Sequence, residues 1–341
     1  MNDSIPPIAP VEPSVPAYKD RSNGLMIFGI LTCVLGCLCG LFILLMLFGQ
    51  IAAAGAARTS AQVPASFSAI LPGLMVYGIL AVALIWLGIG SIQAQRWARA
   101  LLLIFSWSWM FVGVIGLIGM AFIMPKVLAN IPAPATGTAS PPPLPSGAIA
   151  AVMVFMFLFF GIFFIAAPAV WIFFYKGRHV KATCESRHPA TCWTDACPLP
   201  VLGLCVWLLF SAMIMMLMPL MGLGVMPFFG TFLTGLWGTL LCLGMTCLWG
   251  YAAWLIYRLK PQGWWLILAA MIVWMASAWL TFQHHDMLEM YQLMGYPQAQ
   301  IDQIQKTGVF SGNRLNWLME LSGLPLLAYL LFVKRYFPKE V

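Results

Sequence analysis

The densest group of side chains able to bind a metal lies between residues 176 and 199. These ligands follow the order Cys184-x3-His188-x3-Cys192-x4-Cys197. Four-coordinate zinc is held by Cys and His on closely spaced turns, usually from paired Cys-x2-4-Cys units. The segment has enough ligands, but its spacing is loose and it lacks a second pair. Two interpretations stay open: a zinc site at Cys184, His188, Cys192 and Cys197, or reduced thiols in a cytoplasmic loop with no cofactor.

A second polar group contains His284, His285, Asp286 and Glu289. In a helix, His285 and Glu289 lie one turn apart, and an imidazole and a carboxylate at that spacing can share a metal ion or a proton. No further His or Cys lies nearby in the sequence. The pattern therefore favours the polar face of an amphipathic helix over a binding site.

Three further residues indicate where a substrate would bind in a transporter. Glu320 is the only acidic residue within an apolar stretch, and an ionisable group inside a membrane is costly enough to suggest function. It lies near the N-terminal end of its stretch, close to Trp317, so an anchoring role at the membrane–water interface is the alternative. Pro168 and Pro325 are predicted to interrupt helices in their interior, and matched kinks in two halves are typical of a midplane transport site. Glu320, Pro168 and Pro325 are therefore the candidate substrate-binding residues.

Long apolar stretches must position all of these side chains. Hydrophobic residues make up 62% of the 341 residues and charged residues 8%, whereas soluble domains carry about 25% charge. A bilayer core needs about 20 apolar residues in a helix. The stretches that reach this length are 24–54, 68–93, 98–124, 149–175, 200–221, 229–257, 262–283 and 315–336. We predict an all-α membrane protein with eight transmembrane helices.

The basic residues predict the orientation of these helices. With connectors assigned alternately to two sides, thirteen of the 17 Lys and Arg fall on one side. The four on the other side are Arg58, Lys126, Lys306 and Arg314. Because basic residues are retained in the cytoplasm, both termini are predicted to be cytoplasmic. Topology accounts for the net charge of +7, so the charge does not indicate a nucleic-acid partner.

Two matched spacings divide the chain into similar halves. The matched pairs are Trp86 and Trp97 with Trp254 and Trp265, and Pro168 and Arg178 with Pro325 and Arg335. We predict two parallel four-helix repeats, residues 24–175 and 200–341, joined by a cytoplasmic Cys/His loop at 176–199. Chance similarity between apolar segments is the alternative.

Two segments outside the spans have distinct predictions. Residues 1–23 are rich in Pro and poor in apolar side chains, which indicates a disordered cytoplasmic tail. Residues 284–306 read as two short helices broken at Gly295-Tyr296-Pro297, with apolar side chains at helical spacing. They predict an extracytoplasmic amphipathic helical hairpin that lies on the membrane surface or caps the bundle.

Several sequence segments resemble known proteins. The opening YKDRSNGLMIFGIL, the RWAR turn and the stretch from RHVKATCE to WTDACPLPVL are similar to uncharacterised multi-pass bacterial membrane proteins. This resemblance implies a bacterial inner-membrane protein of this topology, and it implies no substrate and no catalytic residue.

Catalytic signatures such as a Walker loop, a dinucleotide fingerprint or a Gly-x-Ser-x-Gly elbow do not occur, so we expect no enzymatic activity. Small-residue faces predict close helix packing; they are Gly36 with Gly40, Gly113 with Gly116 and Gly119, and Gly235 with Gly238. The leading hypothesis is a non-catalytic scaffold or partner-binding subunit that contacts the lipid bilayer and another membrane protein or a second copy. A transporter or channel for a neutral or apolar solute ranks second, and a lipid-active enzyme third.

Overall fold

The computed structural model describes residues 18–57, 67–129, 146–220, 224–306 and 323–337. One group of helices contains α1 (Ser22–Ala57), α2 (Phe67–Ile92), α3 (Arg96–Ala129), α4 (Ser146–Gly161), the π-helical turn η1 (Ile162–Ala166) and α5 (Ala167–Lys176). A second contains α7 (Leu199–Leu220), α8 (Gly235–Tyr257), α9 (Pro261–His284), α13 (Leu324–Val333) and the 3-10 turn η3 (Lys334–Tyr336). The remaining elements are α6 (Arg178–Arg187), the 3-10 turn η2 (Trp193–Asp195), β1 (Met226–Phe228), β2 (Thr231–Leu233), α10 (Met287–Leu293) and α11 (Gln298–Lys306).

Seven helical segments of the described chain are long and apolar enough to cross a membrane. They are Ser22–Ala52, Ile70–Ile92, Arg96–Pro125, Ala150–Lys176, Leu199–Pro219, Gly235–Tyr257 and Pro261–His284. A helix satisfies its own backbone hydrogen bonds, which is what a lipid environment requires. The prediction of an all-α, multi-pass membrane protein is therefore confirmed. The eighth predicted span, 315–336, begins outside the described residues, and its described part contains α13 and η3.

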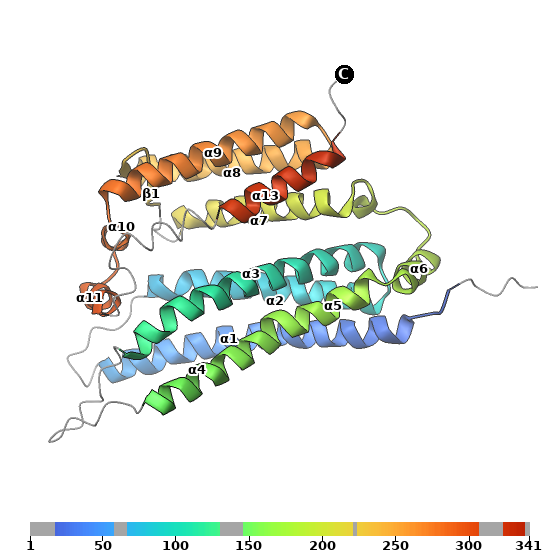
Figure 1. Ribbon diagram of the computed structural model, residues 1–341, viewed down its shortest axis with the longest axis horizontal. Helices are drawn as coiled ribbons and strands as arrows, with labels where there is room; N and C mark the ends of the chain where they lie inside the picture. The colour runs from blue at the N-terminus through green and yellow to red at the C-terminus, as the bar shows by residue number, and fades with distance from the viewer. Residues whose placement is uncertain (1–17, 58–66, 130–145, 221–223, 307–322, 338–341) are drawn as a thin grey trace, which may run out of the picture.

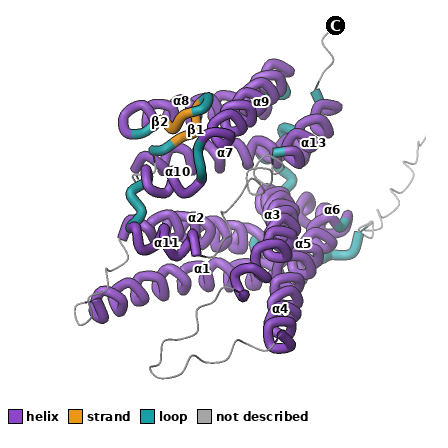
Figure 2. Tube along the Cα trace, turned by 60° about the vertical axis from the view of Figure 1, so that its left-hand side comes forward, coloured by secondary structure: helices purple, strands orange, loops and turns teal. Residues whose placement is uncertain are grey.

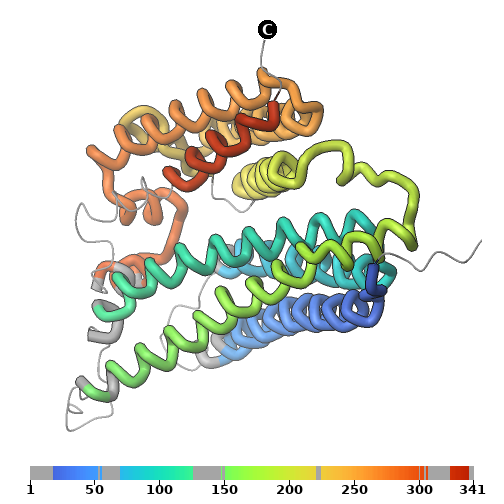
Figure 3. The backbone as a smooth tube through the Cα atoms, turned by 45° about the vertical axis from the view of Figure 1, so that its right-hand side comes forward, coloured from blue at the N-terminus to red at the C-terminus, as the bar shows by residue number. Residues whose placement is uncertain are grey.

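All helix ends that carry the clustered Lys and Arg residues lie at one end of the molecule. Figure 1 shows at this end the start of α1, the α2–α3 and α8–α9 turns, α6 and the end of α13. We call it the basic end, and the opposite end, which carries β1, β2, α10 and α11, the hairpin end. Figure 3 shows the two helix groups as separate layers, with the α6–α7 connection crossing between them at the basic end.

The hydrophobic cores also concentrate towards the basic end. In the first group, the Ser91 hydroxyl donates to the Leu25 carbonyl oxygen (3.1 Å) and lies 2.7 Å from the Tyr175 hydroxyl. In the second, the Trp264 indole N–H donates to the Leu330 carbonyl oxygen at 2.8 Å. Buried polar groups are thus paired between α1, α2 and α5 in the first group and between α9 and α13 in the second. Helix α4, by contrast, has no buried side chain among those described, so its apolar surface faces outward.

The α2–α3 and α8–α9 hairpins close with the same backbone turn. Ala94 and Leu259 both have φ of 54°, and the next residue donates its N–H to a carbonyl oxygen five positions earlier, at 2.9 and 3.0 Å. This is the Schellman type of helix ending. Aligning the two hairpins on these turns gives a different register from aligning them on their matched Trp pairs. Trp97 lies three residues after Ala94, whereas Trp265 lies six residues after Leu259. Trp86 stacks on Trp97 with ring centroids 4.3 Å apart.

A short β-hairpin precedes α8, so the predicted span at 229–257 starts too early. Phe229 and Gly230 form its two-residue turn with φ of 39° and 92°, a backbone that cannot continue a helix. Hydroxyls on α9 hold this turn: Ser277 Oγ accepts from the Phe229 N–H at 2.9 Å, and Thr281 Oγ1 from the Gly230 N–H at 3.1 Å. Figure 2 shows the two strands beside α8 and α9.

Candidate functional site at the basic end

The predicted Cys/His loop contains a helix. Gly177 ends α5 with an extended ψ of 131°, and α6 follows at once. Val180, Thr183 and Cys184 are the buried residues of α6. Their spacing of three and four residues places them on one helical face, which packs against α1 and α3, while the charged side chains lie on the other face.

The residues just before α1 bind to α6. The Tyr18 hydroxyl donates to Ser186 Oγ at 2.6 Å, and the Arg21 backbone N–H donates to Thr183 Oγ1 at 3.1 Å. The prediction of disorder throughout residues 1–23 is therefore wrong for 18–23, because side chains of α6 supply hydrogen-bond partners that composition does not reveal. Residues 1–17 lie outside the described part of the chain.

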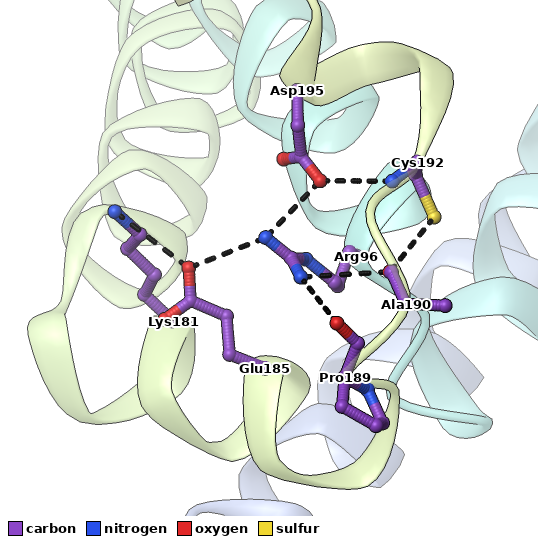
Figure 4. A network of polar contacts seen from close by, with 7 residues as sticks. All are labelled: Arg96, Lys181, Glu185, Pro189, Ala190, Cys192 and Asp195. Carbon is purple, nitrogen blue, oxygen red and sulfur yellow. Dashed lines mark hydrogen bonds and ion pairs between the residues drawn. The ribbon is translucent and has the colours of Figure 1, made fainter.

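Arg96, the first residue of α3, is the centre of a polar network (Figure 4). One guanidinium nitrogen lies 3.1 Å from the carboxylate of Asp195 and 3.7 Å from that of Glu185. The other donates to the carbonyl oxygens of Pro189 and Ala190 at 3.4 and 3.5 Å. The Arg96 side chain is only 16% exposed. A planar guanidinium can bond several acceptors at once, so this residue joins α6, η2 and the segment between them to α3.

Two further contacts hold the same segment. Asp195 accepts the Cys192 backbone N–H at 3.0 Å, which closes the turn before η2. The Tyr257 hydroxyl, at the end of α8, donates to the Trp193 carbonyl oxygen at 2.9 Å. The Trp193 side chain itself is 50% exposed. We call residues 178–197 the platform, because contacts from both helix groups hold its backbone while one indole remains on its surface.

The structure does not bring the four predicted zinc ligands together. Cys184 is buried in the core of the first helix group and Cys197 in that of the second. His188 Nε2 lies 3.0 Å from the Gln93 carbonyl oxygen, and Cys192 belongs to the turn before η2. Among the described residues, no three or more metal-capable side chains form a cluster. Burial raises the pKa of the Cys184 and Cys197 thiols, so both remain protonated at neutral pH.

The predicted His285 and Glu289 pair does form, at the hairpin end. Nδ1 of His285 lies 2.8 Å from the Glu289 carboxylate, and Nε2 lies 3.1 Å from the Gly230 carbonyl oxygen. Since a carbonyl oxygen and a carboxylate both accept hydrogen bonds, the two contacts form together when the imidazole is protonated or when Glu289 supplies the proton. The pair fastens the β-hairpin turn to the start of α10, a contact that the predicted polar face of an amphipathic helix did not include.

The three predicted substrate-binding residues lie in different surroundings. Pro168 is buried in the first turn of α5, directly after the π-helical turn η1, which interrupts the regular hydrogen bonding where proline removes a donor. Pro325 lies in the first turn of α13, which begins at Leu324, rather than in a helix interior as predicted. In a first turn the missing N–H costs nothing. Glu320 lies outside the described residues.

A partly open apolar pocket lies beside Leu326, next to Pro325 in the chain. This cavity of about 150 Å³ is bounded by α7, α8, α9 and α13. Its lining residues are Leu204, Leu208, Ser211, Met215, Trp249, Ile267, Met271 and Leu326. The lining is apolar apart from Ser211 and the Trp249 indole N–H, and it does not include Pro168.

The fold and the site define a multi-pass, all-α membrane protein with a polar platform at its basic end. No family model, curated protein or solved structure matches this chain. Sequence reasoning missed Arg96 as a functional residue. Nothing in the 176–199 segment pointed to it, because the segment has four basic residues of its own that could pair with Glu185 and Asp195.

Proposed function

We propose that this protein is a non-catalytic scaffold or partner-binding subunit of a bacterial inner membrane, and that the platform is its contact surface. The observation that carries the proposal is the half-exposed Trp193 indole on a backbone held by Arg96 and Tyr257. An exposed aromatic side chain on a preorganised surface is a common anchor for a protein partner, because little ordering entropy is lost on binding.

The proposed architecture is eight transmembrane helices in two parallel four-helix repeats. Three features support it: the identical turns at Ala94 and Leu259, the start of α5 and α13 one residue before a proline, and the packing of third on fourth helix in each half. In this arrangement α10 and α11, which flank Gly295 (φ 77°), form an extracytoplasmic amphipathic hairpin.

A labelling experiment tests the proposed orientation, with the basic end and both termini in the cytoplasm. Cys192 is partly exposed and lies outside the described spans, whereas burial and a raised pKa protect Cys184 and Cys197. A membrane-impermeant maleimide is expected to modify the protein in inside-out vesicles and to leave it unmodified in intact spheroplasts. Cys192→Ser should lose the signal. Labelling of Cys192 in intact spheroplasts would contradict the proposed orientation and would place the basic end outside the cytoplasm.

Co-purification tests the proposed function. The tagged full-length protein, extracted from its native membrane in mild detergent, is expected to carry a stoichiometric protein partner identified by mass spectrometry. Trp193→Ala should reduce the amount of partner at least about tenfold, as for loss of an aromatic anchor. Trp237→Ala is the matched control, because it removes an indole that is 69% exposed at the start of α8, at the hairpin end. Equal recovery of the partner with both variants would refute the platform as the contact surface.

Transport of a neutral or apolar solute is the alternative function, and the cavity near Leu326 favours it. An apolar lining with one or two polar groups is the usual composition of a small-molecule site. A protein that purifies without a partner but retains a small molecule would move this alternative to first place.

A further inference from the structure

Four basic side chains lie close to the junction of α8, α9 and α13 at the basic end. Arg258 and Lys260 belong to the α8–α9 turn, and Lys334 and Arg335 follow α13. All four are exposed, and none forms an ion pair with another residue of the described chain. We call them the basic corner.

In the first helix group, the arginine at the start of the third helix is paired with carboxylates. There Arg96, in the first turn of α3, faces the carboxylates of Glu185 and Asp195, which the platform supplies. In the second group, the first turn of α9 has no such carboxylate beside it within the described residues. Among the described residues, the basic corner is therefore a concentration of positive charge without carboxylates of the kind that Arg96 faces.

Both lysines of the basic corner contact indole rings. Lys334 Nζ lies over Trp264 at 4.6 Å and over Trp265 at 5.1 Å from the ring centroids. Lys260 Nζ lies 5.3 Å from the centroid of Trp254. Cation–π contacts orient the side chains without neutralising them, so each can still bind an anion. Trp and Lys at the ends of transmembrane helices typically lie at the level of lipid headgroups.

The backbone adds to the positive potential. Helix α9 begins at Pro261, and no side chain caps its N-terminus. Trp264 and Trp265, whose rings Lys334 contacts, lie in its first two turns. The N-terminus of a 24-residue helix carries partial positive charge, which favours an anion nearby. A helix N-terminus, two aromatic-bound lysines and two arginines thus converge on one place at the end of the spans.

We propose that the basic corner binds the phosphate headgroup of an anionic phospholipid. A phosphodiester matches the lysines in charge and hydrogen bonding, and it matches the α9 N-terminus in charge. The acyl chains would lie along the exposed apolar faces of α9 and α13, where Trp265 and Leu331 are 53% and 61% exposed. This inference does not depend on the scaffold function.

Native mass spectrometry of the full-length protein in mild detergent tests the inference. The protein is titrated with dioleoylphosphatidylglycerol, with dioleoylphosphatidylcholine, or with inorganic phosphate. Wild-type protein is expected to bind phosphatidylglycerol at least about tenfold more tightly than phosphatidylcholine, because only the former carries a net negative charge. Lys334→Gln with Arg335→Gln should weaken phosphatidylglycerol binding about thirtyfold, or about fivefold per cation.

The control removes the same charge from the first helix group. Lys176→Gln with Arg178→Gln changes two exposed cations where α5 ends and α6 begins, and it should alter binding by less than about twofold. Lys260→Gln, with an expected loss of about fivefold, keeps the test available where the double variant is not monodisperse. Equal binding of both lipids, or equal losses in both double variants, would overturn the proposal. Displacement of the lipid by inorganic phosphate at equal concentration would assign the corner to free phosphate instead.

Discussion

Gly88→Leu is expected to abolish recovery of folded protein. A Cβ atom at Gly88 in α2 would lie 2.5 Å from the Cys33 sulfur, 2.7 Å from the Gly29 carbonyl oxygen and 2.9 Å from the Cys33 backbone nitrogen of α1. Two of these atoms are backbone, so α1 and α2 would have to separate over their whole contact. Adding one methylene to a packed interior already costs about 1–3 kcal/mol, and leucine adds four carbon atoms.

The measurement is the yield of monodisperse protein after extraction in mild detergent, together with its thermal unfolding midpoint. Gly40→Leu is the matched control on α1, because no atom lies within 4 Å of a Cβ built there. That variant is expected to match the wild type in yield. Comparable yields for Gly88→Leu and Gly40→Leu would show that the α1–α2 contact is not close packed.

Arg96→Met is expected to open the platform while the membrane-spanning helices remain folded. The change leaves Glu185 and Asp195 without their shared cation and frees the carbonyl oxygens of Pro189 and Ala190. Because both carboxylates are more than a third exposed, water compensates part of the loss, and we expect about 2 kcal/mol rather than the larger cost of a buried pair. The open form of the platform should become about thirtyfold more populated.

Hydrogen exchange of residues 178–197 and maleimide labelling of Cys184 measure this opening. Cys184 is only 1% exposed in the folded platform, so its labelling reports exposure directly. Lys181→Met serves as the control, since it removes only a surface ion pair 3.7 Å from Glu185 on the same helix, worth about 0.3–0.5 kcal/mol. Equal exchange and equal labelling in both variants would show that Arg96 does not hold the platform closed.

Hydropathy and charge alone predicted much of the fold. Seven of the predicted spans coincide with helices that are long and apolar enough to cross a membrane. The Lys and Arg pattern separated the connectors correctly, because the described basic clusters lie together at one end. Both patterns reflect the free energy of transferring apolar or charged groups between water and lipid. This free energy is a property of each residue, so it can be estimated along the sequence.

The close packing of helices was less predictable. Of the glycines in the predicted small-residue faces, three lie close to another segment, Gly36, Gly113 and Gly238. A Cβ atom built at any of the other four would have nothing within 4 Å; these are Gly40, Gly116, Gly119 and Gly235. The tightest approach of α1 and α2 involves Gly29 and Gly88, which the sequence did not single out. Helix spacing identifies small residues on one face, but only the crossing point of two helices decides which of them touch.

The candidate site shows the same division. By itself the sequence determined a chain of membrane-spanning helices, its clustered cations and a polar segment rich in Cys and His, because composition sets the transfer free energy of each stretch. Tertiary structure decided that Cys184 and Cys197 are buried in different cores, that Arg96 joins the acids of the platform, and that Lys334 lies over Trp264 in the basic corner. Each of these depends on contacts between residues far apart in the chain, such as Arg96 with Asp195 or Trp264 with Lys334, and local composition carries no information about such contacts.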